Sequence, residues 1–145
     1  MRILVDTNIF IDYFTGRDEE SCKAAKLFFV LCRRFKNQTF VTSMSLRDIE
    51  YFAHKIYHDK EKSLKLLSET YSLCSKVIGI SADAAIEAIY SNMSDFEDCL
   101  QSMAASEAML DCIVTNNVKD YVNSVIPAFT PSELNKAMLS KKTEC

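Results

Sequence analysis

The stretch Ile3-Leu4-Val5-Asp6-Thr7-Asn8 carries the first signal of the fold. Its three consecutive apolar residues predict a strand buried on both faces, which is typical of the centre of a parallel sheet. The polar trio that follows places Asp6 at the carboxyl end of this strand. In open parallel sheets, ligands bind beyond the carboxyl ends of the strands. Asp6 is therefore the first candidate functional residue.

Strand-like and helix-like segments alternate along the rest of the chain. Helical periodicity is clearest over residues 19–34, and the later strands are expected at residues 39–42, 77–80, 112–114 and 125–129. Alternation without an internal repeat predicts an α/β fold, a three-layer α/β/α sandwich with a central, mostly parallel sheet of four to five strands. We expect a single domain over residues 1–139 and a frayed tail over residues 140–145.

Length and composition are those of one ordinary globular domain. The chain has 145 residues, of which 48% are hydrophobic and 26% charged, with only two Gly and two Pro. The sequence shows neither a signal-peptide pattern nor an apolar run of roughly 18–20 residues that could span a membrane. We therefore expect a cytoplasmic protein that does not contact a membrane. Its six cysteines form no CxxC pair, which favours reduced cysteines packed in the core.

Acidic residues recur at the predicted ends of the elements around Asp6. Asp48 is expected in the first turn of a helix capped by Ser45, Asp95 and Asp98 at the start of a later helix, and Asp120 just beyond the fourth strand. Oxygen ligands without His or Cys would select Mg2+ or Mn2+. Acids in first turns also have a simpler explanation, because the helix dipole favours them there. Asp120 could equally be a turn residue, and Ser94 with Glu97 matches a capping box.

Four segments together resemble the motifs of PIN-domain nucleases of the VapC-like toxin type. They are Ile3-Leu4-Val5-Asp6-Thr7-Asn8, Val41-Thr42-Ser43-Met44-Ser45-Leu46-Arg47-Asp48-Ile49, Asp95-Phe96-Glu97-Asp98-Cys99-Leu100-Gln101 and Ile113-Val114-Thr115-Asn116-Asn117-Val118-Lys119-Asp120-Tyr121. They occur in the family order and span nearly the whole domain. The resemblance implies a Mg2+- or Mn2+-dependent ribonuclease that cleaves RNA to leave a 5'-phosphate.

The resemblance also assigns roles to individual positions of this chain. It implies catalytic acids at Asp6, Asp48, Asp98 and Asp120, metal ligands at Asp6, Asp98, Asp120 and Asp95, and supporting hydrogen bonds from Thr7, Asn8, Thr115 and Asn117. Arg47, next to Asp48, is the candidate RNA contact. PIN domains of this size commonly act as the toxin of a toxin-antitoxin pair, which implies an antitoxin partner and a homodimer.

Two positions depart from the family pattern and keep a second interpretation open. The family acid at position 48 is usually Glu, and the middle residue of the closing motif is commonly Arg, where this chain has Asn116. The shorter Asp48 side chain draws its carboxylate back by about 1.5 Å, which could weaken metal coordination. The alternative is a catalytically weakened scaffold that binds RNA or a protein. An aspartyl phosphotransferase is disfavoured, because Asn8 stands where that class needs a second acid.

Charge raises a further question about nucleic-acid binding. The formal net charge is -3, which disfavours a protein that grips RNA by neutralising phosphates. Binding of RNA therefore requires bound cations or a local cluster of basic side chains.

Overall fold

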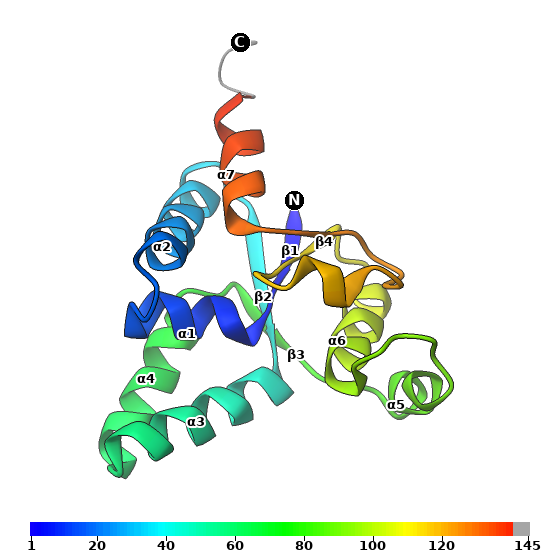
Figure 1. Cartoon of the computed structure of the whole chain (residues 1–145), viewed down its shortest axis with the longest axis horizontal. Coiled ribbons are helices and arrows are strands. Elements are labelled where there is room, and N and C mark those ends of the chain that lie inside the picture. Colours follow the sequence, from blue (N-terminus) through cyan, green and yellow to red (C-terminus); the bar gives the residue numbers. More distant parts are fainter. Residues whose placement is uncertain (141–145) are drawn as a thin grey trace.

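A five-stranded parallel sheet forms the centre of the computed structural model, which describes residues 1–140 (Figure 1). In chain order the strands are β1 Arg2–Val5, β2 Gln38–Thr42, β3 Lys76–Ile78, β4 Cys112–Val114 and β5 Ala128–Phe129, and their order in the sheet is β3-β2-β1-β4-β5. The strand that carries the opening motif is thus central: Leu4 pairs with Phe40 of β2 and with Ile113 of β4. The predicted parallel α/β fold is confirmed.

Helices cover both faces of the sheet, as a three-layer sandwich requires. They are α1 Thr7–Thr15, α2 Glu19–Arg34, α3 Ser43–Tyr57, α4 Lys60–Ser72, α5 Ala82–Ile89, α6 Phe96–Glu107 and α7 Pro131–Ser140, with a short 3-10 helix, η1, at Val118–Tyr121. Figure 1 shows α1 to α4 and α7 on one side of the strands and α5 and α6 on the other. Residue 140 ends α7, and the rest of the predicted tail, residues 141–145, lies outside the described residues.

Alternating side chains of β1 divide the core into two parts. Ile3 and Val5 pack into the cluster formed with α1, α2 and α7, whereas Leu4 packs into the cluster formed with α6 and η1. All three side chains are fully buried. Because successive side chains of a strand face opposite ways, a three-residue apolar run is what a strand covered on both faces needs.

Two helix starts differ from the prediction, and both differences follow from capping. Thr42, the last residue of β2, caps α3 by accepting the Ser45 N–H at 3.0 Å, so the helix begins without a loop and Asp48 lies in its second turn. The expected cap at Ser45 and first-turn position of Asp48 were wrong. Asp95, rather than Ser94, caps α6, because its carboxylate accepts two backbone N–H groups while a Ser hydroxyl offers a weaker acceptor.

The five cysteines among the described residues, Cys22, Cys32, Cys74, Cys99 and Cys112, are free, and all but Cys74 are buried. Burial raises the pKa of the Cys32 and Cys74 thiols to about 12, which keeps them protonated and unreactive. The predicted free cysteines packed in the core are confirmed for Cys22, Cys32, Cys99 and Cys112, whereas Cys74 is only partly buried. Within residues 1–140, no helix combines the length and apolar character that a membrane span requires.

Candidate active site

Asp6 is held in place by four hydrogen bonds at the carboxyl end of β1. Its Oδ1 accepts the Thr7 N–H and the Gln101 amide, each at 2.7 Å, and its Oδ2 accepts the Asn8 amide at 2.8 Å and the Thr115 hydroxyl at 2.7 Å. The residue is buried, with only 5% of its surface exposed. Burial raises the pKa of Asp6, and the four donors oppose that rise by stabilising the carboxylate.

A second acid, Asp48 of α3, lies beside Glu97 of α6. The sequence had suggested only a capping role for Glu97. Arg47 donates to Asp48 Oδ1 at 2.6 Å, while the buried Oδ2 has no partner among the described residues. The Glu97 carboxyl group lies near enough to Asp48 to feel its negative charge and is partly withdrawn from water, although the Glu97 residue as a whole is exposed. This partial burial, followed by the charge of Asp48, raises the pKa of Glu97 to about 7.

Asp98, in the first turn of α6, is the third perturbed acid. Its Oδ1 accepts the hydroxyl of Tyr121 from η1 at 2.9 Å. Partial burial raises the pKa of Asp98 to about 6, the negative charges of Asp6, Asp95 and Asp120 add to the rise, and the Tyr121 hydrogen bond opposes it. Burial and the nearby acids also raise the pKa of Tyr121, which stays protonated and donates. Asp98 therefore shares the negative potential of the site.

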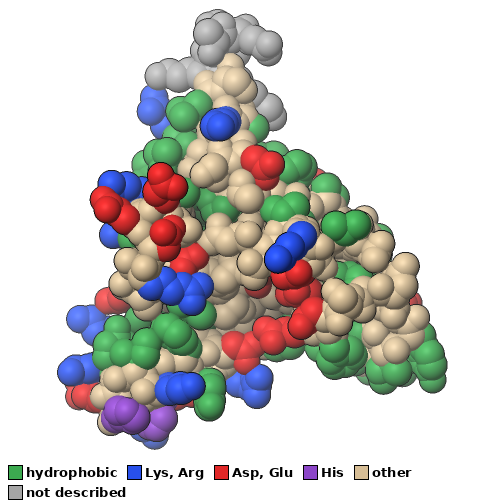
Figure 2. All heavy atoms as spheres, in the orientation of Figure 1, with side chains coloured by type: hydrophobic (Ala, Val, Ile, Leu, Met, Phe, Trp, Pro, Cys, Tyr) green, Lys and Arg blue, Asp and Glu red, His purple; other side chains and the backbone are tan. Residues whose placement is uncertain are grey.

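The remaining predicted acids lie nearby but have other contacts. Asp95 caps α6 through its Oδ1, which accepts the backbone N–H groups of Glu97 and Asp98, and its charge adds to the raised pKa of Asp98. Asp120 belongs to η1 and likewise contributes charge, with no side-chain hydrogen bond among the described residues. Figure 2 shows acidic side chains gathered at the lower centre of this face, where Figure 1 places the starts of α3 and α6.

The predicted supporting residues divide into two groups. Asn8 and Thr115 hold Asp6 directly with their side chains. The Thr7 hydroxyl donates instead to Ser45 at 2.9 Å, and Asn117 acts through its backbone N–H, which donates to Thr115 Oγ1 at 3.0 Å. The Thr7 hydroxyl and Asn117 therefore support the site one contact away from the carboxylate, whereas the Thr7 N–H contacts it directly.

Gln101 links the two halves of the site and was missed by the sequence interpretation. It is fully buried, donates to Asp6, and accepts the Ser45 hydroxyl at 3.2 Å. The available signal was its position three residues after Asp98, which puts both side chains on neighbouring parts of one helix face. A buried amide at such a position needs polar partners.

The donor set has the chemistry of a divalent cation site, although its geometry is open. Carboxylate oxygens suit Mg2+ or Mn2+, and an unpartnered buried oxygen on Asp48 together with two raised acid pKa values marks an excess of negative charge. Within residues 1–140, no three His, Cys, Asp or Glu side chains lie close enough to hold an ion as they stand. The four hydrogen bonds of Asp6 also use the roughly four lone-pair sites that a carboxylate offers, which leaves no free site for a cation. A cation would require one donor to give way.

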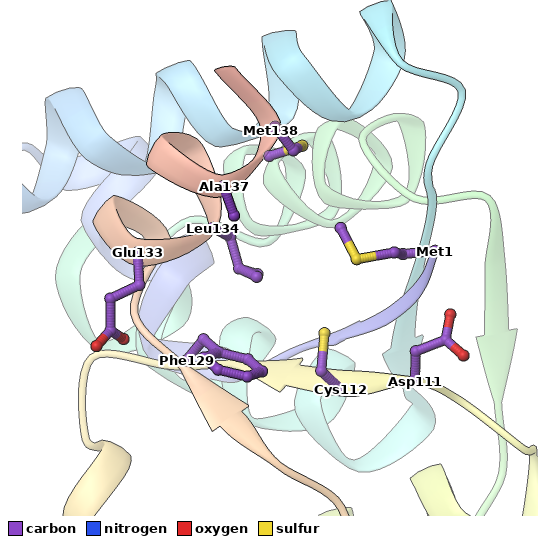
Figure 3. A pocket seen from close by; sticks show the side chains of 8 residues that line it. All are labelled: Met1, Asp111, Cys112, Phe129, Glu133, Leu134, Ala137 and Met138. Atoms are coloured by element: carbon purple, nitrogen blue, oxygen red, sulfur yellow. The ribbon is translucent and has the colours of Figure 1, made fainter. Parts of the chain in front are cut away.

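A separate apolar pocket lies at the amino ends of β1 and β4 and has a different character (Figure 3). It measures about 400 Å³ and is lined mainly by Met1, Cys112, Phe129, Leu134 and Met138. Its two acids are used structurally: Asp111 accepts the Arg2 N–H, and Glu133 accepts the Thr130 N–H and hydroxyl. The acids at the other end of the sheet therefore form the stronger candidate for chemistry.

Comparison with solved structures supports the architecture. The chain is similar to a DNA-bound VapBC from Salmonella typhimurium (TM-score 0.68, 19% identity, covering 90% of this chain and 98% of that one). It is also similar to a toxin-antitoxin complex from Klebsiella pneumoniae (0.63, 24%, 89% and 97%). A third similar structure is the sarcin-ricin loop cleaving toxin VapC20 from Mycobacterium tuberculosis (0.58, 13%, 77% and 86%). At these identities the likeness establishes the fold.

Comparison of the sequence with family models gives a match that covers the first three motifs and most of the fourth. The model described as PIN domain matches residues 2–119, from β1 into η1. No curated protein was found to match the chain. The matched region contains Asp6, Asp48, Asp95 and Asp98 together with the residues that hold Asp6. The chain belongs to the PIN domain family.

Proposed function

We propose that this PIN domain is a metal-dependent endoribonuclease that hydrolyses phosphodiester bonds in RNA. The observation that carries the proposal is the group of carboxyl groups at the carboxyl end of the sheet, two of which have strongly raised pKa values. Structural ion pairs usually lower acid pKa values, whereas here partial burial raises both values and the charges of neighbouring acids add to the rise. A bound cation would neutralise these charges. Mg2+ or Mn2+ is the ion that this oxygen donor set favours.

Asp6, Asp48, Glu97 and Asp98 are the side chains that would hold the cation, with Asp95 and Asp120 adding negative charge. A bound divalent cation supplies an activated water and polarises a phosphoryl oxygen. Asn8, Thr115 and Gln101 fix the orientation of the Asp6 carboxylate, since each donates to it directly. Arg47, with its side chain 80% exposed beside Asp48, can meet an RNA phosphate at the same edge.

The biological role that we propose is that of the toxin in a toxin-antitoxin pair, acting in the cytoplasm. Two of the similar structures are a VapBC and a toxin-antitoxin complex, and a third is a toxin that cleaves the sarcin-ricin loop. The proposed partners are a single-stranded or looped RNA, an antitoxin that covers the acidic site, and a second copy of the chain.

Titration of Mn2+ into wild-type protein with single-stranded RNA tests the activity. Wild type should cleave the RNA in a Mn2+-dependent way and leave 5'-phosphate ends, and Asp6→Asn should abolish cleavage. Asp83→Asn is the matched control, because Asp83 is an exposed first-turn acid of α5 and should leave cleavage unchanged. Wild-type protein that folds and binds Mn2+ without cleaving RNA would contradict the proposal.

A catalytically weakened scaffold is the second candidate, favoured by the open arrangement of the acids and by Asp48 at a position where the resembling family has Glu. It would bind RNA or a protein without Mn2+-dependent cleavage. The same titration separates the two functions, because Mn2+-dependent cleavage that requires Asp6 excludes the scaffold.

A further inference from the structure

Asp12 is a buried acid of α1 that lies outside the four motifs. The residue is 3% exposed; its Oδ1 accepts from Arg17 Nε at 2.7 Å, and its Oδ2 accepts from the Asn116 amide. A buried carboxylate is tolerated when a cation and hydrogen bonds compensate it. Because the Asn116 side chain is neutral, Arg17 is the cation that compensates Asp12 in the described part of the chain.

Arg17 is connected to Asp6 through a short series of hydrogen bonds. Beyond Asp12 and Asn116, the Asn116 N–H donates to Asn8 Oδ1 at 3.2 Å, and the Asn8 amide donates to Asp6 Oδ2 at 2.8 Å. Each link joins two ordered groups, so the guanidinium has a defined position relative to the proposed catalytic carboxylate. This connection distinguishes Arg17 from lysines and arginines on solvated helix faces.

The contact with Asp12 leaves most of the guanidinium available. Only Nε donates to Asp12, the two terminal nitrogens have no hydrogen-bond partner among residues 1–140, and 54% of the side chain is exposed. Gly16 makes the turn that brings Arg17 back toward α1: it ends the helix in the left-handed region, with φ 59°, where glycine is favoured. A guanidinium held by Nε presents its two terminal N–H2 groups as a fork, which suits the paired oxygens of a phosphate.

We propose that Arg17 binds a backbone phosphate of the RNA next to the one that is cleaved. Asp12 follows Asp6 by six residues along α1, about 9 Å along the helix axis at 1.5 Å for each residue. A guanidinium held on Asp12 at this spacing suits a phosphate next to the one at Asp6 rather than the same phosphate. With Arg47 at α3, it provides the local positive charge that a chain of net charge -3 needs for RNA binding. This inference rests on the proposed function.

The number of phosphate contacts can be measured from the salt dependence of RNA binding. An Asp6→Asn background keeps the RNA intact, and fluorescence anisotropy with a single-stranded RNA dodecamer gives the affinity over a series of NaCl concentrations at fixed, low Mg2+. For single-stranded nucleic acid, each lost contact makes the slope of log K against log salt shallower by about 0.7. Arg17→Gln should show this change, and Arg17→Lys should retain the steeper slope. Lys23→Gln is the matched control, because Lys23 is 72% exposed and paired with Glu19 on α2.

Each outcome supports or overturns the assignment. An Arg17→Gln slope equal to that of Lys23→Gln overturns it, even if affinity falls, because a purely structural disturbance weakens binding without removing a phosphate contact. Undetectable binding of the dodecamer by the Arg17-containing protein also overturns it. If wild type cleaves RNA but Arg17→Gln leaves the salt-dependence slope unchanged, the phosphate contact of Arg17 is refuted and the nuclease activity is not. If Arg17→Gln gives a shallower slope but wild type does not cleave RNA, the nuclease activity is refuted and Arg17 remains an RNA contact.

Discussion

Replacing Glu97 by Gln removes the negative charge of one of two neighbouring acids, Glu97 of α6 and Asp48 of α3. In the absence of divalent cations, the pKa of Glu97 is raised from 4.5 to about 7 by partial burial and by the charge of Asp48. The native state therefore binds a proton at this position more tightly than the unfolded chain does. Its contribution to stability is fully present below about pH 4.5 and is lost as the pH rises through about 7.

The size of the effect follows from the same shift. A rise from 4.5 to about 7 is equivalent to about 3 kcal/mol at roughly 1.4 kcal/mol for each pH unit. Glu97 is exposed to solvent, and screening by water reduces the effect to about 1 kcal/mol. At pH 8, Glu97→Gln should therefore raise the free energy of unfolding by about 1 kcal/mol, or the melting temperature by about 3 °C for a domain of this size. At pH 5 the protonated Glu97 and Gln should be nearly equivalent.

Urea unfolding of both proteins at pH 5 and pH 8, in EDTA, measures the difference. Glu69→Gln is the control, because Glu69 is an exposed acid of α4 and its side chain makes no hydrogen bond in the described residues. The control should change stability by the same small amount at both pH values. If Glu97→Gln changes the free energy of unfolding equally at both pH values, or lowers it at pH 8, Glu97 is not held beside Asp48 against charge repulsion.

Three further substitutions test other contacts of the site. Gln101→Leu removes a buried donor to the Asp6 carboxylate and should lower the free energy of unfolding by about 2 kcal/mol in urea titrations; a stability within error of wild type would contradict the contact. Tyr121→Phe removes the hydroxyl that lowers the pKa of Asp98, so the pKa measured by carboxyl NMR titration should rise above about 6, and no rise would contradict this role. Asp48→Glu extends an unpartnered oxygen by about 1.5 Å and should tighten Mn2+ binding several-fold in calorimetry, whereas weaker binding would show that Asp is the better fit.

The fold was predictable because local patterns in this chain agree with the global arrangement. The apolar run of β1 predicted a strand buried on both faces, and the helical periodicity of α2 predicted one buried face. Both sets of side chains are buried in the structure. Ends of elements were less predictable, as the start of α3 shows. Thr42 is both the end of a strand and the cap of the next helix, and sequence alone does not distinguish it from Ser45 as the cap.

The central acid was predictable from its position after a buried strand, whereas the role of Glu97 depended on a distance between helices. Glu97 and Asp48 lie on α6 and α3, and only the packing of both helices at the edge of the sheet brings their carboxyl groups together. A capping interpretation of Glu97 was locally sufficient, so the sequence contained nothing that required a second role. The pairing also changes the meaning of the short Asp48 side chain. In the proposed cation site, the longer Glu97 side chain of α6 would supply the reach that position 48 lacks.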